Sequence, residues 1–313
     1  MEIKIDESNI NKRLDKLFEG FSRSKIALAI EEGIIRVNQK KQKPSYKLKK
    51  EDVISYDNNE LDAFLNPSDE LLGYDFKLDI KYEDDDILII NKPKDILTHP
   101  TKHERLKSIS NALIFHCGKN NLSNLSGLDR LGIVHRLDKN TSGLMIAAKN
   151  NETHKIIENQ IRNKTLMRKY KAIALGEFEN SEGVINKPLV HYLKDDVKMT
   201  VSDRGLEAIT KYKVLEQFKG AALVELELKT GRTHQIRAHL SSINHPVFGD
   251  SLYGAKSFMR NEFYNLKTIE QLLQSYYISF IHPKTNKQTE FQLDEDEYSK
   301  DFIKVLNFLR RNN

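Results

Sequence analysis

Residues 132–150 read GIVHRLDKNTSGLMIAAKN, in which a basic pair, one carboxylate and a polar turn come directly before an apolar run. The apolar residues Leu144–Ala148 are typical of a buried strand. Asp138 therefore lies at a strand edge, where a turn holds a side chain rigidly while leaving it open to a cleft. The same position also suits an aspartate that only stabilises the turn, and local statistics alone favour that second interpretation.

More strands are predicted on both sides of this stretch. Alternation in KLDIKY (77–82) and the apolar run Ile87–Ile90 predict two strands, which an acidic turn at Asp84–Asp86 connects. A helix is predicted over Glu152–Asn163. At least three further strands are predicted, within residues 168–178, 206–218 and 221–230. Because strands dominate and no regular βαβ order is present, the fold class is α+β with a mixed or antiparallel sheet.

Composition places the chain among globular proteins. It has 313 residues, 39% of them hydrophobic, which suits one large domain and one small one. The first residues, MEIKIDESNI, do not resemble a signal peptide, and runs such as ILII are too short to span a bilayer. Cys117 is the only cysteine, which excludes an internal disulfide and a cysteine-rich zinc site. We therefore expect a soluble, cytoplasmic protein that does not enter a membrane.

Basic residues are concentrated near the N-terminus. Residues 11–56 contain twelve Lys or Arg and six acidic residues, whereas the whole chain has a formal net charge of +5. This asymmetry is expected where one part of a chain grips a polyanion. A lysine-rich solvated surface would show the same excess, so charge alone leaves both interpretations open.

The basic segment carries the pattern of a small α/β module. Apolar spacing predicts helices over residues 11–20 and 22–33, with Ser22 able to cap the second helix and Gly33 able to end it. Short strands are predicted around Ile35–Val37 and Val53–Ile54. The basic residues lie opposite the apolar stripe of the second helix, so a hairpin that merely packs on the body is the weaker alternative.

The order RLDKL, SRSKI, EEGIIRVNQK and PSYKLKKEDVI resembles the S4 RNA-binding domain from about Lys12 to Tyr56. The resemblance implies a small S4 (αL-type) domain, residues 1–60, that contacts structured RNA. The candidate RNA-binding residues are Arg23, Lys25, Lys40, Lys41 and Lys43. An acidic, Asn-rich stretch with Pro67 then predicts a linker at residues 57–74, followed by a catalytic domain at 75–313.

Four segments of the body, in order, resemble the RluA/RluD-type pseudouridine synthases. They are YEDDDILIINKP with THP (82–100), HRLDKNTSGL (135–144), RKYKAIALGE (168–177) and LKTGRTHQIRAHLSSINHPVFGDSLYG (228–254). The resemblance implies the fold of that family, built on a mixed, largely antiparallel sheet. It also implies detachment of uracil from its ribose, rotation of the base and rejoining through C5, without cofactor, metal or ATP.

Three catalytic residues follow from the resemblance. Asp138 matches the essential aspartate, which must stay ionised in a partly apolar pocket and therefore needs a cation beside it. Arg237, the arginine of HQIR, is the expected partner and can hold a carboxylate bidentately. Arg232 is the alternative partner or a phosphate contact. Tyr170 matches the tyrosine that lies against the target base, where its ring stacks on uracil and its hydroxyl serves an acid or base role.

Other motif residues are assigned to RNA contact or to the framework. Ile236 is expected to form the apolar floor under the base, and Arg136 to fill the gap that the flipped nucleotide leaves. For His135 two roles stay open, namely an RNA contact and a local turn contact. The framework is assigned to Asp250 and Tyr253. His234, His239 and His245 lack the spacing and the nearby acid of a zinc site, so no metal is predicted.

The sequence thus predicts an RNA pseudouridine synthase that acts on large-subunit (23S) ribosomal RNA or a pre-ribosomal particle. A tRNA uridine is the alternative substrate, and a non-catalytic RNA-binding or ribosome-assembly factor is the alternative of another class. A glycoside-cleaving enzyme would need a second carboxylate beside Asp138, which the motif does not offer. Nothing in the sequence requires more than a monomer.

Overall fold

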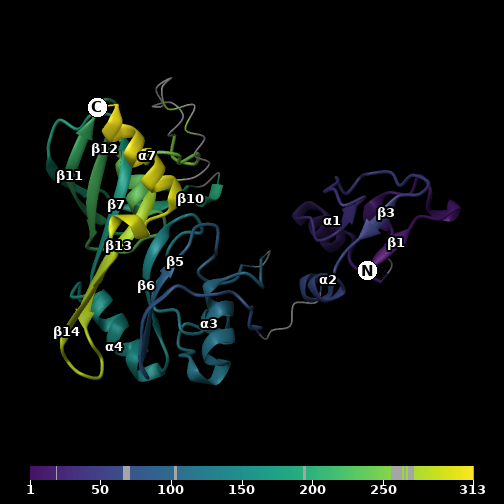
Figure 1. Cartoon of the computed structure of the whole chain (residues 1–313), viewed down its shortest axis with the longest axis horizontal. Coiled ribbons are helices and arrows are strands. Elements are labelled where there is room, and N and C mark those ends of the chain that lie inside the picture. Colours follow the sequence, from purple (N-terminus) through teal and green to yellow (C-terminus); the bar gives the residue numbers. More distant parts are fainter. Residues whose placement is uncertain are drawn as a thin grey trace. The chain divides into compact units, whose positions relative to one another are not determined.

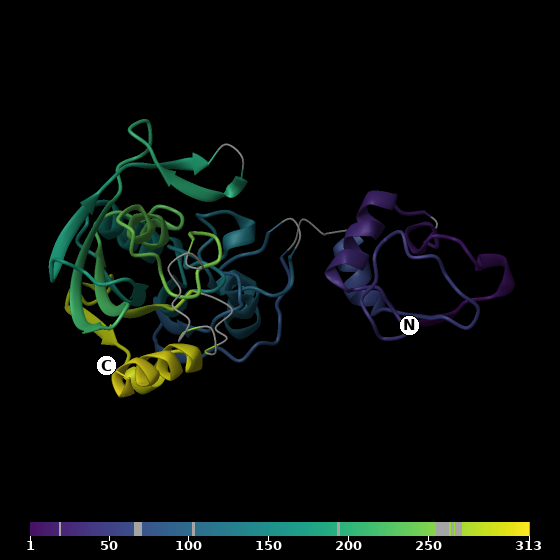
Figure 2. The same cartoon turned by 90° about the horizontal axis from the view of Figure 1, so that it is seen from above.

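The chain forms two compact units in the computed structural model, which describes residues 1–18, 20–65, 71–101, 104–192, 195–254, 263, 266 and 271–312. The N-terminal unit comprises Met1–Leu71 with Thr101–Arg105, and the C-terminal unit comprises Leu72–Pro100 with Leu106–Asn313 (Figures 1 and 2). Among the residues described, no helix has the length and apolarity needed to cross a membrane.

The N-terminal unit packs helices on a small antiparallel sheet. The sheet has the order β1 (Glu2–Lys4), β3 (Val53–Ser55) and β2 (Arg36–Val37). Helix α1 (Arg23–Glu32) begins after Ser22 and ends at Gly33, which has a φ of 80°. The helix turns Ile26, Ala29 and Ile30 into the core. The second predicted helix of this unit, with its apolar stripe, is confirmed.

The first predicted helix of this unit is not formed by the residues described there. Residues 11–18 and 20 contain one short 3₁₀ helix, Leu14–Lys16, in place of an α-helix. The backbone N–H groups of Asn11 and Leu14 donate to the carbonyls of Leu48 and Tyr46, at 2.8 Å each. Because those N–H groups pair with a distant segment, they are not available to an α-helical ladder.

A helix also occupies the first half of the expected linker. Helix α2 spans Asn58–Leu65, and its Leu61 and Leu65 belong to the buried core of the N-terminal unit. The Lys25 ammonium donates to the Leu65 carbonyl at 2.6 Å. Residues 58–65 are therefore part of the N-terminal unit and do not behave as a spacer, while residues 66–70 lie outside the described part of the chain.

A nine-stranded sheet forms the C-terminal unit (Figure 1). Its order is β4 (Ile80–Glu83), β5 (Ile87–Lys92), β6 (Ser142–Ala148), β13 (Leu273–Ile281), β7 (Met167–Leu175), β12 (Ala221–Leu228), β11 (Ile209–Phe218) and β8 (Glu182–Asn186), with β14 (Gln288–Gln292) on β13. Among the described strands of this sheet, β6 and β13 pair in parallel and the other pairs are antiparallel. The predicted α+β class with a mixed, largely antiparallel sheet is confirmed.

The remaining elements surround this sheet. Strands β9 (Leu189–Tyr192) and β10 (Asp195–Val201) form a separate antiparallel pair. The helices are α3 (Ile109–Cys117), α4 (Asn151–Arg162), α5 (Gln235–Ser242) and α7 (Lys300–Arg311), with 3₁₀ helices at Glu7–Asn9, Lys119–Asn121, Leu128–Arg130 and Glu295–Glu297. Helix α4 begins and ends one residue earlier than predicted, and the ends of the strands expected around it differ by a few residues from their predicted positions.

The parallel contact between β6 and β13 requires a glycine. Gly143 has a φ of 121°, and a Cβ atom at this position would lie 2.0 Å from the Ser275 carbonyl oxygen. No other residue fits so close to a neighbouring backbone. The glycine of the TSGL motif therefore lets β13 approach the start of β6, directly after the turn that carries Asp138.

The two faces of the sheet have different partners, as β7 illustrates. Ile173 and Leu175 pack in one core with Phe302 and Leu306 of helix α7. Because successive side chains in a strand point to opposite faces, Tyr170 lies on the other face. The side chain of Tyr170 is buried there and lines a cavity.

His135 holds the segment before Asp138 against β6. Its Nε2 accepts a hydrogen bond from the Ile146 N–H at 3.1 Å. Burial, and secondly the charge of Arg168, lower the pKa of His135 to about 3. The folded chain therefore keeps this imidazole neutral through the mildly acidic range.

Replacement of Leu65 by Ala should destabilise the N-terminal unit by about 2–4 kcal/mol, since it removes a fully buried side chain of α2 from the core. Hydrogen exchange of the full-length protein should show faster exchange in α1 and β3. Asn59→Ala, on the exposed face of the same helix, is the matched control. Unchanged exchange in the Leu65 variant would mean that the segment is a spacer after all.

Stability should fall as the pH drops from about 6.5 toward 3, because the unfolded chain then binds a proton at His135 that the folded chain excludes. At pH 5 this single group contributes on the order of 2 kcal/mol of destabilisation. His135→Gln retains an acceptor for Ile146 and should flatten the change of melting temperature between pH 7 and pH 5. His191→Gln, at an exposed position, should leave the pH dependence as in the wild type.

Candidate active site

A cavity of about 490 Å³ lies in the C-terminal unit. Its wall is formed by residues of the 134–141 segment, by β7 and by the segment from the end of β12 to the start of α5. It brings together all the site residues predicted for the body, namely His135, Arg136, Asp138, Tyr170, Arg232, Ile236 and Arg237. Residues that are up to about a hundred positions apart in the sequence thus share one site.

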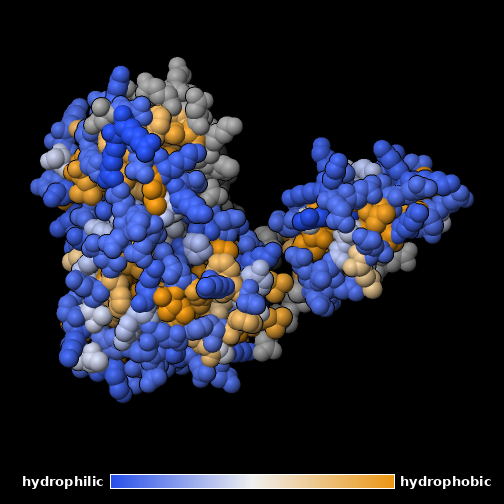
Figure 3. All heavy atoms as spheres, in the orientation of Figure 1, coloured by the Kyte–Doolittle hydropathy of each residue, from blue (hydrophilic) through white to orange (hydrophobic). Residues whose placement is uncertain are grey.

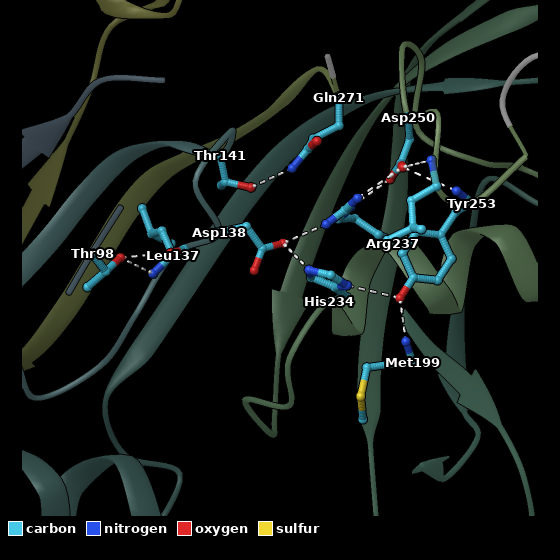
Figure 4. Close-up of polar contacts among 11 residues, drawn as sticks. Thr98, Leu137, Asp138, Thr141, Met199, His234, Arg237, Asp250, Tyr253 and Gln271 are labelled. Carbon is cyan, nitrogen blue, oxygen red and sulfur yellow. Dashed lines mark hydrogen bonds and ion pairs between the residues drawn. The ribbon is translucent and has the colours of Figure 1, made fainter. Parts of the chain in front are cut away.

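The turn that carries Asp138 is closed by its own backbone. The Thr141 N–H donates to the Asp138 carbonyl at 3.1 Å. The Asp138 carboxylate instead faces Arg237 and His234 (Figure 4). Because the backbone closes the turn, the carboxylate is free for the cavity, and the interpretation of Asp138 as a capping residue is not needed.

The segment before β6 is anchored by the THP and NKP motifs. The Thr98 hydroxyl donates to the Leu137 carbonyl at 2.7 Å and accepts from the Leu137 N–H at 3.2 Å (Figure 4). The fully buried ammonium of Lys92 donates to the Lys139 carbonyl at 2.9 Å. Asp138 is thus held between two residues whose carbonyls are both fixed by hydrogen bonds.

Arg237 joins two carboxylates. Its Nη1 lies 3.2 Å from Oδ2 of Asp138, whereas its Nε and Nη2 lie 2.6 Å and 3.0 Å from the two oxygens of Asp250 (Figure 4). Arg237 therefore lies beside Asp138, as a cationic neighbour. The expected bidentate contact is made instead to Asp250, because that carboxylate, 13 residues further on, lies fully buried behind the guanidinium.

The electrostatics of this group keep Arg237 charged. Burial lowers the pKa of Arg237, but its hydrogen bonds to Asp250 and the charges of both carboxylates outweigh burial and hold the pKa above its ordinary value. The guanidinium thus stays protonated beside Asp138, whose side chain keeps 18% of its surface exposed. An ionised, accessible carboxylate is the form that nucleophilic or base chemistry requires.

His234 is a site residue that the sequence interpretation missed. Its Nε2 lies 3.8 Å from Oδ2 of Asp138, and its Nδ1 lies 3.1 Å from the Tyr253 hydroxyl (Figure 4). The Tyr253 oxygen accepts from the Met199 N–H at 2.9 Å, so its own proton can be donated to Nδ1. The proton of a neutral His234 then lies on Nε2, toward Asp138.

The backbone of His234 supports a functional position. Its φ of 52° is left-handed, which costs a non-glycine residue roughly 1–3 kcal/mol. Burial lowers the pKa of its imidazole, the charge of Asp138 opposes this shift, and that of Arg237 adds to it. The neutral ring is therefore the expected form. Its place in the HQIR motif, directly before the helix that carries Arg237, was the available signal.

Tyr170 and Ile236 supply flat and apolar surface. Both side chains are buried, and both line the cavity. Burial raises the pKa of the Tyr170 hydroxyl, so the phenol stays neutral. This combination suits a planar, uncharged base.

The other predicted RNA contacts of the body have distinct settings. Arg136 is exposed at the cavity, and it makes no hydrogen bond or ion pair with the part of the chain described. Arg232 is also exposed, and its Nε donates to the Glu207 carbonyl at 3.0 Å instead of contacting Asp138. His135 makes the contact to Ile146 given above, which is the local alternative of the two considered.

The candidate residues of the N-terminal unit belong to a separate body. Arg23 donates to Asp15 at 3.2 Å, and Lys25 is used in the contact to α2. Lys40, Lys41 and Lys43 are exposed. The visible face of this unit is mostly hydrophilic (Figure 3). These lysines are therefore free of the core and available to solvent or to a polyanion.

The three histidines considered for metal binding have separate contacts. His239 is bonded to Thr210 and to the Lys187 carbonyl, and His245 is bonded to the Leu175 carbonyl. One other group of possible ligands lies together among the described residues, namely Glu83, His116 and Cys117. Burial raises the pKa of that thiol to about 11, and Lys149 already pairs with Glu83.

Comparison with known proteins agrees with this geometry. Residues 86–242 match the family model described as RNA pseudouridylate synthase, and residues 10–54 match the S4 domain. The uncharacterized RNA pseudouridine synthase YlyB of Bacillus subtilis is 35% identical, over 100% of this chain and 99% of its own length.

Two further proteins support the assignment. The ribosomal large subunit pseudouridine synthase D of Vibrio cholerae is 35% identical, over 92% of this chain and 89% of its own length. The structure of human RNA pseudouridylate synthase domain containing 4 superposes with a TM-score of 0.59 at 25% identity, over 74% of this chain and 92% of that one. The chain belongs to the RNA pseudouridine synthases, isomerases that act on RNA, and carries an S4 domain at its N-terminal end.

Proposed function

We propose that this protein converts specific uridines of large-subunit (23S) ribosomal RNA to pseudouridine, with Asp138 as the essential catalytic residue. The observation that carries the proposal is the buried Asp250–Arg237 pair, which presents a protonated guanidinium to an accessible Asp138. In the reaction the C1′–N1 bond breaks, the base rotates, a C1′–C5 bond forms, the proton on C5 leaves, and N1 takes up a proton. The product is an isomer of the substrate, so no atoms are gained or lost.

The side chains of the cavity divide the work. The Asp138 carboxylate acts at the sugar or base, while Arg237 keeps it ionised. The Tyr170 ring stacks on the uracil, with Ile236 beneath the base. Arg136, exposed and without a protein partner among the described residues, fills the gap in the RNA, which offsets part of the unstacking cost of a few kcal/mol.

The ribosomal target is proposed from the relatives. The proteins of Vibrio cholerae and Zymomonas mobilis, 35% and 34% identical over more than nine tenths of this chain, are both named ribosomal large subunit pseudouridine synthase D. A tRNA uridine stays the alternative, because the same cavity serves the same chemistry on either RNA. We further propose that the enzyme acts as a monomer in the cytoplasm.

Mapping pseudouridine at nucleotide resolution in total RNA, with and without this gene, tests the target directly. Loss of one or more 23S sites in the deletion strain supports the proposal. Loss confined to tRNA would replace the ribosomal target by the alternative.

Asp138→Asn should reduce pseudouridine formation by about 10⁴-fold or more while RNA affinity changes little, because the substitution keeps the shape and removes the charge. Single-turnover assays on the mapped RNA measure the rate, and filter binding measures the affinity. Asp129→Asn, at an exposed position of the same unit, is the matched control. Turnover of Asp138→Asn at the wild-type rate would refute the role of Asp138.

Residues 1–71 are the continuous part of the N-terminal unit. Their removal should weaken RNA binding and make it less dependent on salt concentration. Each lost phosphate contact reduces the slope of log K against log salt by just under one. The triple change of Lys40, Lys41 and Lys43 to Gln should reproduce part of this effect in the full-length chain. An unchanged slope in the truncated protein would mean that the cavity unit alone grips the RNA.

A further inference from the structure

Arg168 is a buried cation that has no partner in the part of the chain that the structure describes. Only 7% of its surface is exposed, yet it lines the cavity. Its guanidinium makes no hydrogen bond or ion pair with any residue in the described ranges, and its Nε is buried without an acceptor. The same wall holds a second buried nitrogen without an acceptor, Nδ1 of His135. Since Ile146 donates to Nε2, the proton of the neutral imidazole lies on Nδ1, so both unmatched groups are donors.

The guanidinium is fixed in position beside the base-stacking residue. Arg168 and Tyr170 are two residues apart on β7, so they share a face of the sheet, about 7 Å apart along the strand. Gly231 packs against the guanidinium, since a Cβ atom there would lie 3.4 Å from Nη1 and 3.5 Å from Nη2. A charged group thus lies next to the place of the target uracil.

The described lining of the cavity provides no anion for this cation. It contains two acidic residues, Asp138 and Glu207. Asp138 is engaged by Arg237, and Glu207 lies 3.5 Å from the Lys164 ammonium. The basic residues of the same lining are Arg136, Arg162, Lys164, Arg168, Lys229, Arg232 and Arg237. A buried charge that lacks a partner destabilises the folded chain, so a bound ligand is the expected source of compensation.

We propose that Arg168 binds a phosphodiester group next to the flipped uridine, and that this contact fixes the nucleotide along β7 while Tyr170 holds the base. A uracil carbonyl would offer an acceptor but no charge, whereas a phosphodiester offers both, in the geometry that a guanidinium fork matches. The inference rests on the proposed function, because it takes the substrate to be a flipped uridine in RNA. It adds a phosphate site inside the cavity to the roles given above.

The free protein provides the first test. Arg168→Gln removes the uncompensated charge, so the melting temperature of the RNA-free protein should rise by about 2–4 °C, while affinity for the mapped RNA falls by about tenfold or more. Arg162→Gln, at an exposed cation of the same lining, should leave the melting temperature unchanged. A purely structural Arg168 would instead give a lower melting temperature, and that result would overturn the proposal.

The RNA provides the second test. A stem-loop that carries the mapped uridine is prepared with a neutral methylphosphonate at the linkage 5′ or 3′ of that uridine, and binding is measured in the Asp138→Asn background. At one linkage the neutral group should weaken binding about tenfold with Arg168 present and not at all with Arg168→Gln. Arg168→Lys, which keeps the charge, should retain an intermediate sensitivity. The fold loss in affinity caused by Arg168→Gln and the fold loss caused by the methylphosphonate are compared with the loss when both are present. If the two losses simply multiply at both linkages, Arg168 does not contact those phosphates.

The two proposals fail in different ways. The binding cycle needs no catalysis, so it gives the same answer whether or not Asp138 is the essential carboxylate. Absence of any pseudouridine product from wild-type protein on the mapped RNA would refute the proposed function and leave the binding result standing. If the losses in affinity multiply and the wild-type protein turns over normally, the proposed role of Arg168 is refuted and the proposed function is not.

Discussion

The site depends on one buried guanidinium shared by two carboxylates. Arg237 is oriented by the two hydrogen bonds that it donates to Asp250, and its remaining nitrogen then points at Asp138, 99 residues away in the sequence. Without Asp250, Arg237 and Asp138 would form a neutral ion pair in which the two side chains bond only to each other. With Asp250 as the orienting partner, Arg237 can stabilise the charge of Asp138 through a single contact. One oxygen of the carboxylate is thus engaged, and the other is left for chemistry.

The sequence motifs are recognisable because they carry the residues that support Asp138 as well as Asp138 itself. Lys92 and Thr98, from the first motif, fix the carbonyls on either side of Asp138. Gly143 admits the backbone of β13 beside β6. These three motif positions therefore restrict how far Asp138 can move relative to Arg237. Preorganisation of this kind requires precise neighbours, which accounts for motifs longer than the reacting residues alone demand.

Local patterns predicted a helix whose hydrogen bonds are local and strands in which apolar and polar side chains alternate regularly. Helix α1 followed from apolar spacing and Gly33, and β7 and β12 followed from alternation. The predictions that failed share one physical cause, because in each case contacts with residues distant in the sequence override the local pattern. The helix expected at residues 11–20 lost its N–H groups to the segment around Leu48, and α2 exists because Leu61 and Leu65 find a core. The roles of Asp250 and His234 likewise depend on partners that no local pattern identifies.

The two units use positive charge in physically different ways. Lys40, Lys41 and Lys43 are exposed, so salt screens them and their attraction acts over roughly 10 Å in solution. Arg168 and Arg237 are buried, where screening is weak and a partner must arrive in the correct geometry. Exposed lysines can gather many RNAs but discriminate poorly among them. If the proposed roles hold, the buried arginines take only a nucleotide that has left its stack, and the choice of uridine then depends on which RNA can deliver one to the cavity.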